Sequence, residues 1–123
     1  MKRGGLLHAE LSRLVAALGH GDELVLADAG LPVPPGVPCV DLAVAPGVPA
    51  LLDVARAVAG ELVVAELVLA EELLADGGPL LAALAALWPA AAQRALPHAA
   101  FKARTAAARA VVRTGEFTPY ANA

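Results

Sequence analysis

The sequence predicts an α/β fold built from layers of helices and strands. Stretches with the apolar period of a helix alternate with short runs of valine, leucine and alanine that suit buried strands. Glycine or proline separates most of these stretches, as expected where a helix or strand ends. Because alternating helices and strands pack into layered α/β domains, this alternation predicts the fold class.

Composition limits the protein to a few classes. A chain of 123 residues suits one domain, and 59% hydrophobic residues can form a core. Much of this content is alanine, and small alanine-rich domains often gain stability by oligomerising. The net charge of −3, with no basic run, argues against a nucleic-acid partner, and the N-terminal apolar stretch is too short for a signal peptide or membrane span. The single cysteine excludes an internal disulfide, so we expect a reducing, cytoplasmic environment.

The first third of the chain is predicted to form a helix, a strand and a loop. Residues 23–27 are predicted to form a short buried strand, and residues 28–38 contain four prolines, which indicates a loop. The helix precedes both and ends at Gly19. Its predicted buried face consists of Leu7, Leu11, Leu14, Val15 and Leu18.

The middle third is predicted to hold two strands around a helix. Residues 39–44 form the second strand candidate. A Pro-Gly-Val-Pro segment then opens a helix over residues 50–59, which a glycine ends. Residues 62–69, rich in valine and leucine, are predicted as a third strand, although Glu71 and Glu72 could extend this segment into a helix.

The last third is expected to be mainly helical. Gly77-Gly78-Pro79 interrupts the chain before a short alanine/leucine helix that reaches about Leu87. Residues 93–96 are a weak fourth strand candidate. A helix is expected over residues 98–114 with Gly115 at its end, followed by GEFTPYANA as a loop or the start of a strand.

His20 and Asp28 are the first candidates for chemistry. His20 lies between two glycines, and a histidine can act as an acid or base near neutral pH; alternatively, it is an exposed residue favoured by the helix C-terminus. Asp28 follows the first predicted strand, where it could accept a hydroxyl or orient an imidazole, or simply cap the next turn. Because strand ends and tight loops often carry function, the two side chains could meet across one pocket.

Several other kinds of site are disfavoured. The three histidines lie far apart without metal-binding spacing, and the only serine, Ser12, lies in a predicted helix, which argues against a metal site and a serine triad. The sequence contains neither a Gly-x-x-x-x-Gly-Lys phosphate loop nor a Gly-x-Gly-x-x-Gly pattern. Cys39 is expected to be a buried, unreactive thiol. Glu71 and Glu72 are expected to be surface charges.

Four blocks carry a resemblance to a known family. They are LGHGDELVLADAGLPVP, DLAVAPGVPALLDV, LAEEL and HAAFKARTAAARAVVRTGEFTPYAN, in this order. Together they resemble the D-ribose pyranases, bacterial ribose mutarotases that accompany ribose uptake, over nearly the whole chain. The related L-fucose mutarotases share the His-Gly-Asp start, whereas Gly30-Leu31 and the segment 119–122 match the ribose branch.

This resemblance implies one α/β/α domain over residues 1–123 with a central mixed β-sheet. It implies an isomerase that interconverts the pyranose and furanose forms of D-ribose without a cofactor or metal; activity on L-fucose or another monosaccharide, or sugar binding without catalysis, are the alternatives. A cytoplasmic homo-oligomer is implied, a pentamer-based ring or decamer with sites near subunit contacts, and no nucleic-acid or membrane partner. Family members continue past Tyr-Ala-Asn as an apolar final strand, which is either cut off or missing here.

The resemblance also assigns roles to individual residues. His20 matches the catalytic histidine, which we expect to give a proton to the ring oxygen; general acid catalysis of this kind contributes about 10²–10⁴-fold in rate. Lys102, one helical turn after His98, could also face the site. The positions that match sugar-binding or sugar-covering residues are Asp28, His98, Tyr120, Ala121 and Asn122.

Overall fold

The computed structural model describes residues 1–76 and 78–123, so the expected break at Gly77 lies outside the described residues. The helices are α1 (Ala9–Ala17), α2 (Leu51–Ala59), α3 (Glu71–Asp76), α4 (Pro79–Leu87) and α5 (His98–Arg104), followed by a 3-10 turn, η1 (Thr105–Ala107). The strands are β1 (Leu24–Ala27), β2 (Cys39–Asp41), β3 (Glu66–Ala70), β4 (Ala92–Leu96) and β5 (Ala110–Arg113).

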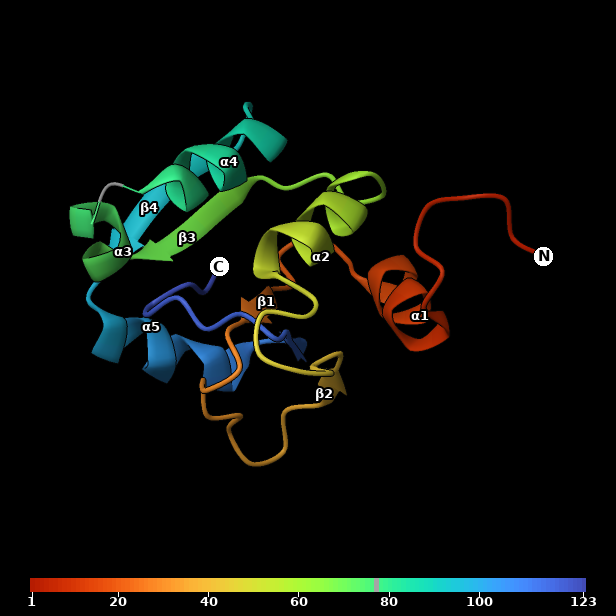
Figure 1. Ribbon diagram of the computed structural model, residues 1–123, viewed down its shortest axis with the longest axis horizontal. Coiled ribbons are helices and arrows are strands. Elements are labelled where there is room, and N and C mark those ends of the chain that lie inside the picture. The colour runs from red at the N-terminus through yellow and green to blue at the C-terminus, as the bar shows by residue number, and fades with distance from the viewer. Residues whose placement is uncertain (77) are drawn as a thin grey trace.

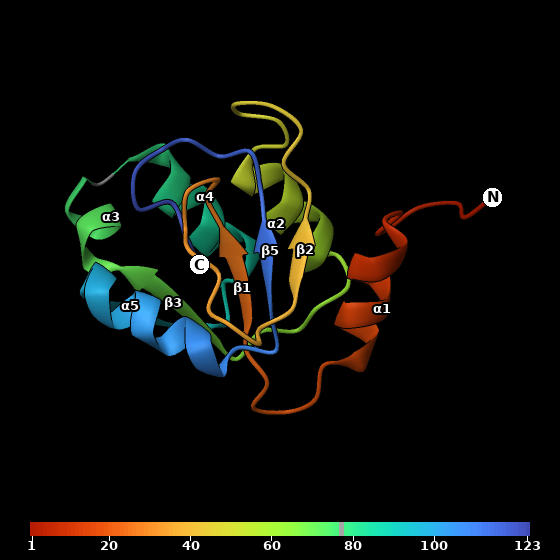
Figure 2. The same cartoon turned by 90° about the horizontal axis from the view of Figure 1, so that it is seen from below.

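The strands form two sheets, and the named strand pairs are all parallel. One sheet has the order β1–β5–β2 and the other pairs β3 with β4. In Figure 1, α4 lies over the β3–β4 pair, and in Figure 2, β5 lies between β1 and β2. The α/β class is confirmed, although the strands are divided between two sheets. An antiparallel contact occurs where Ala123 and Leu26 exchange two backbone hydrogen bonds of 2.7 and 2.9 Å.

The expected helix over residues 98–114 is wrong in its second half. α5 ends at Arg104, and Ala110–Arg113 is the central strand β5, paired with β1 on one side and β2 on the other. A short apolar run fits a buried strand as well as a helix. Here the paired valines and the cover on both faces favour the strand, because a parallel sheet buries consecutive residues.

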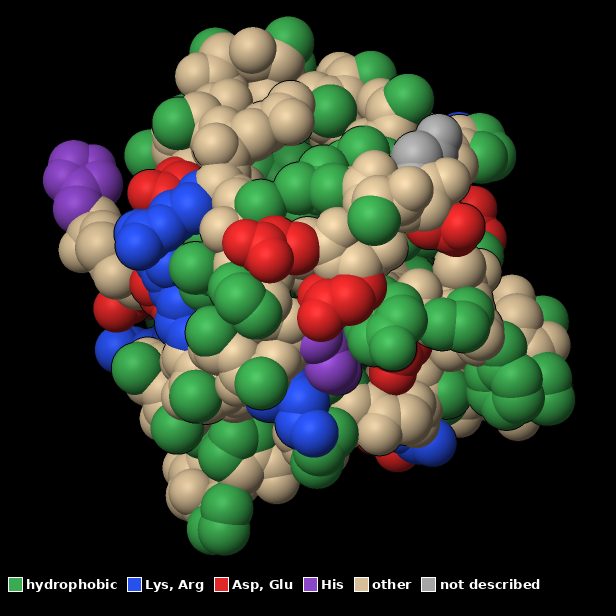
Figure 3. Space-filling model, turned by 90° about the vertical axis from the view of Figure 1, so that its left-hand side faces the viewer, with side chains coloured by type: hydrophobic (Ala, Val, Ile, Leu, Met, Phe, Trp, Pro, Cys, Tyr) green, Lys and Arg blue, Asp and Glu red, His purple; other side chains and the backbone are tan. Residues whose placement is uncertain are grey.

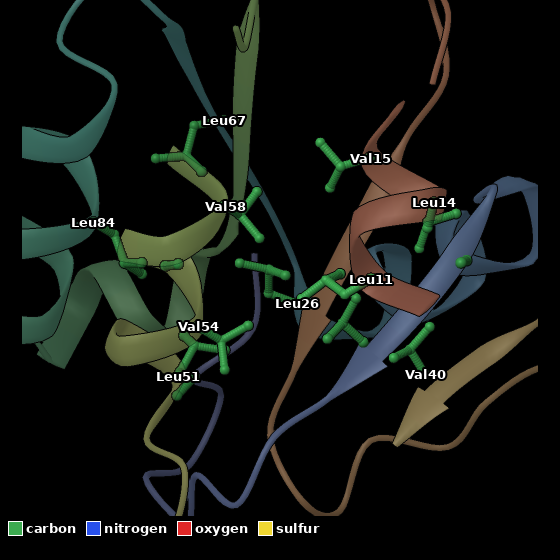
Figure 4. Packing of buried hydrophobic residues seen from close by; sticks show 14 of the residues in the cluster. Leu11, Leu14, Val15, Leu26, Val40, Leu51, Val54, Val58, Leu67 and Leu84 are labelled. Atoms are coloured by element: carbon green, nitrogen blue, oxygen red, sulfur yellow. The ribbon is translucent and has the colours of Figure 1, made fainter. Parts of the chain in front are cut away.

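The two faces of the three-stranded sheet contribute to separate clusters. On one face Leu26, Val40 and Val112 pack with leucines and valines of α1 and α2, as Figure 4 shows for the labelled side chains. On the other face Val111 packs near Phe101 of α5 and the loop after β1. Each fully buried leucine or valine stabilises the folded state by about 1.5–3 kcal/mol. This packing on both faces of the sheet holds in place the strand ends near the site.

Two side chains stand at the start of an element. His8 is the N-cap of α1, where its side chain accepts the backbone N–H of Leu11. Cys39 is exposed, so its expected burial is wrong: β2 is a three-residue edge strand in which only Val40 points inward. Partial desolvation, and then the nearby Asp41, raise the pKa of the Cys39 thiol.

No helix among residues 1–76 and 78–123 is long and apolar enough to cross a membrane.

Candidate functional site

The C-terminal segment crosses the carboxyl end of β1. Asp28 directly follows this strand, and its Oδ2 accepts a hydrogen bond of 3.0 Å from Nδ2 of Asn122. The backbone N–H of Asp28 donates in turn to Oδ1 of Asn122, at 2.8 Å. Asn122 is completely buried and Asp28 is half-buried. The reciprocal pair therefore fixes the Asp28 carboxylate to a segment far away in the sequence.

Asp28 also caps the turn that follows it. Its Oδ1 accepts the backbone N–H of Gly30 at 2.9 Å, which is the local role that the sequence offered as the alternative. Each carboxylate oxygen has two acceptor positions, so both oxygens can still accept a hydroxyl from a ligand. The structural role of Asp28 is therefore compatible with a binding role.

His98 and Tyr120 form the second half of the site. The Tyr120 ring stands edge-on to the His98 imidazole, with ring centroids 5.0 Å apart and an interplanar angle of 77°. Tyr120 has a φ of 60°, a left-handed conformation that is rare for a residue of this size. Nδ1 of His98 is buried and has no hydrogen-bond partner in the described part of the chain, which leaves Nε2 as the ring nitrogen available to a ligand.

Ala121 and Lys102 are the two remaining residues that the family resemblance assigned to the site. Ala121 is completely buried and donates its backbone N–H to the carbonyl of Thr118, so it holds the turn between Tyr120 and Asn122. Lys102 lies four residues after His98 on α5, which puts both on one helix face. Its side chain is exposed.

Glu72 was missed as a site residue. It was expected to be a surface charge, but it is half-buried, and both its carboxylate oxygens accept the backbone N–H of His98, at 3.1 and 2.9 Å. Pro97, which precedes α5, supplies no side-chain cap, so Glu72 satisfies this helix end. Figure 3 shows the side of the molecule that lies at the left in Figure 1, where histidine, acidic and basic side chains gather on one face. Glu72 follows β3 and His98 follows β4, and the parallel pairing of these two strands brings both residues to one edge of the sheet.

His20 lies elsewhere in the single chain. It is exposed in the turn before β1, between Gly19 and Gly21, whose φ of 83° is accessible to glycine. Asp28 follows the same strand, and four strand residues alone span about 13 Å. His20 lines a pocket of about 800 Å³ beside the edges of β1 and β3, whereas Asp28 lines a separate pocket of about 360 Å³. The two side chains therefore do not meet across one pocket within one chain.

The electrostatics of the site centre on carboxylates. Partial burial raises the pKa of Glu116, but hydrogen bonds from Thr118 and from the backbone N–H of Leu51 outweigh this effect, so its pKa lies below the ordinary value. Among the residues that the structure describes, no group of three or more His, Cys, Asp or Glu side chains could hold a metal ion. The arrangement offers hydroxyl acceptors, an imidazole and an aromatic ring, which together suit a polyhydroxylated ligand.

Comparison with known proteins gives the family of this chain and several similar relatives. Residues 1–123 match the model of the RbsD / FucU transport protein family. The chain belongs to this family. A D-ribose pyranase of Paracidovorax citrulli is 55% identical over 99% of this chain and 93% of the relative, and that of Bacillus subtilis is 45% identical with the same coverage. The RbsD / FucU membership confirms the resemblance drawn from the four sequence blocks.

Solved structures of the RbsD / FucU family share the fold. The structure of Bacillus subtilis RbsD complexed with D-ribose matches with a TM-score of 0.93 and 45% identity, covering 99% of this chain and 93% of that one. FucU from Bifidobacterium longum matches with a TM-score of 0.75 and 25% identity, covering 92% and 89%. The chain is therefore more similar to this ribose-binding RbsD than to this FucU.

Proposed function

We propose that this protein is a D-ribose pyranase, an isomerase that interconverts the pyranose and furanose forms of D-ribose. One observation carries the proposal: the TM-score of 0.93, over 99% of the chain, to Bacillus subtilis RbsD complexed with D-ribose. The pairing of Asp28 with Asn122, and of His98 with Tyr120, supports it, because these pairs bring hydroxyl acceptors and an aromatic ring together. The single cysteine, Cys39, suits action in the reducing cytoplasm.

The reaction needs proton transfer and no change of oxidation state. One group removes the proton of the anomeric hydroxyl while another protonates the ring oxygen, and the ring opens to an aldehyde. After rotation, a different hydroxyl attacks the carbonyl and closes the other ring. Asp28 and His98 Nε2 accept and orient the sugar hydroxyls, Lys102 donates to one of them, and the Tyr120 ring covers an apolar face of the sugar. Asn122 fixes the Asp28 carboxylate.

We further propose that His20 supplies the proton to the ring oxygen in the site of a neighbouring copy. General acid catalysis needs a contact of about 3 Å, and His20 lies at the opposite end of β1 from Asp28. His20 is exposed in a short turn, so it is free to enter the site of a second subunit. A closed ring of copies, in which each His20 serves the next site, satisfies this geometry, as in the pentamer-based assembly that the family resemblance implies.

Exchange between sugar forms tests the activity directly. Saturation-transfer NMR on D-ribose at equilibrium should show pyranose–furanose exchange that is faster with protein than without it. L-fucose under the same conditions tests the alternative substrate. Acceleration with L-fucose alone, or D-ribose binding without faster exchange, would contradict the proposal and favour a fucose mutarotase or a sugar-binding module respectively.

A further inference from the structure

Glu116 connects three parts of the molecule around the site. Its Oε2 accepts the backbone N–H of Leu51, the first residue of α2, at 3.0 Å. Its Oε1 accepts the hydroxyl of Thr118 at 2.8 Å and the Thr118 backbone N–H at 3.3 Å. The Glu116 carbonyl accepts the backbone N–H of Ala29, in the loop after β1, at 2.9 Å. One half-buried residue therefore joins α2, the Asp28 loop and the C-terminal segment.

The N-terminus of α2 is a favourable partner for the Glu116 carboxylate. Ala50, at the N-cap of this nine-residue helix, has no side chain that can satisfy the free N–H groups, so the Glu116 carboxylate takes that place. Gly115 fixes the backbone just before Glu116, because a side chain there would overlap the carbonyl oxygens of Val48 and Ala45. The position of the carboxylate is therefore determined from both sides.

The hydrogen bonds of Thr118 connect Glu116 to the proposed sugar-binding residues. The carbonyl of Thr118 accepts the N–H of Ala121 at 3.2 Å, and the carbonyl of Tyr120 accepts the N–H of Asn122 at 2.8 Å. This tight turn holds Tyr120 at a φ of 60°, a conformation that persists only where surrounding contacts maintain it. Glu116 ties the start of this turn to α2, whereas the Asn122–Asp28 pair and the Ala123–Leu26 bonds hold its end.

We propose that Glu116 is a positioning residue for the sugar, which holds the turn of Tyr120 and Asn122 by linking Thr118 to the N-terminus of α2. It acts through that turn rather than by touching the sugar. The role in sugar binding rests on the proposed function, whereas the role in ordering the turn does not.

Glu116→Gln tests both roles. The amide keeps the volume but replaces one acceptor oxygen with a donor, which opposes the N–H groups that Glu116 now accepts. Because the turn binds the sugar in ground and transition states alike, we expect the KM for D-ribose to rise about tenfold while kcat changes less than about threefold. Hydrogen exchange of segment 116–123, measured by mass spectrometry without sugar, should become faster.

Glu61→Gln is the matched control. Glu61 also accepts a backbone N–H from a distant segment, that of Leu6 at 2.9 Å, so the same substitution replaces a carboxylate of the same kind by an amide away from Tyr120. We expect unchanged KM and unchanged exchange of segment 116–123. Equal kinetic changes in both variants would trace the effect to general destabilisation and overturn the proposal.

The remaining outcomes separate the two proposals. Unchanged exchange of segment 116–123 in Glu116→Gln would overturn the positioning role whether or not the wild type acts on D-ribose. A wild type without ribose exchange would overturn the proposed function alone. Should Glu116→Gln fail to fold, Thr118→Val removes only the hydroxyl arm, and a KM for D-ribose equal to that of wild type would then overturn the role.

Discussion

Asn122→Ala would show how firmly the Asp28 carboxylate is tied to the C-terminal segment. The substitution removes both hydrogen bonds of the reciprocal pair, which measure 3.0 and 2.8 Å, at a side chain that is completely buried. An unsatisfied buried N–H costs about 1–3 kcal/mol, and a lost bond to a charged group about 1.5–3 kcal/mol. Water can reach the half-buried carboxylate and recovers part of this loss, so the free energy of unfolding should fall by about 2–4 kcal/mol.

Urea denaturation of a double-mutant cycle measures the pair itself. Asp28→Ala and Asn122→Ala, alone and combined, should show a coupling free energy of about 1–3 kcal/mol, because both substitutions remove the bond from Asn122 Nδ2 to the Asp28 carboxylate. The bond from the Asp28 backbone N–H is lost only in Asn122→Ala and does not enter the coupling. Gln93→Ala is the control, since it removes an exposed amide and should change the stability by less than about 0.5 kcal/mol. Additive effects of the two substitutions, within about 0.5 kcal/mol, would refute the view that the pair fixes the carboxylate.

Three further results are expected. His20→Ala should abolish ribose exchange and leave the fold intact, because His20 is exposed; a folded variant with substantial NMR exchange would rule it out as the proton donor. Asp28→Asn and His98→Ala should each raise the dissociation constant for D-ribose about tenfold, and calorimetry with both constants unchanged would exclude the site. Since the pKa of Glu116 lies below its ordinary value of 4.5, its contribution to stability is present above the unfolded-state pKa and is lost as the pH falls through the folded-state pKa. The stability of the wild type should therefore fall more steeply below about pH 4.5 than that of Glu116→Gln, and parallel curves would contradict this.

Local order in the sequence indicated Asp28, because it follows a short apolar run and precedes a turn, and the structure places it directly after β1. His98 was assigned through the family resemblance, and the structure places it two residues after β4, at the start of α5. Glu72 was missed because its role depends on β3 lying beside β4, and no local pattern reveals which strands are neighbours. The distance between His20 and Asp28 was missed for a related reason, since short separation in the sequence hides the length of the strand between them.

Two features of the fold were also out of reach of local patterns. Ala110–Arg113 has the composition of a helix segment as well as of a buried strand, and only its pairing with β1 and β2 decides between them. Cys39 has the apolar surroundings of a buried residue, but its strand lies at the edge of a sheet. In both cases the deciding contact is made by residues far away in the sequence.

Co-assembly of two inactive variants tests most directly the claim that neighbouring copies complete each ribose site. His20→Ala lacks the proton donor and Asp28→Asn lacks a sugar-binding carboxylate, so each alone should show little exchange at D-ribose concentrations well below the dissociation constant. In a ring of equal and random mixture, about a quarter of the sites combine an intact Asp28 with an intact His20 from the next copy. The account therefore expects co-expressed variants to recover about a quarter of the wild-type rate of pyranose–furanose exchange, measured by NMR. Variants that co-assemble as shown by mass spectrometry, yet recover no exchange, would contradict it.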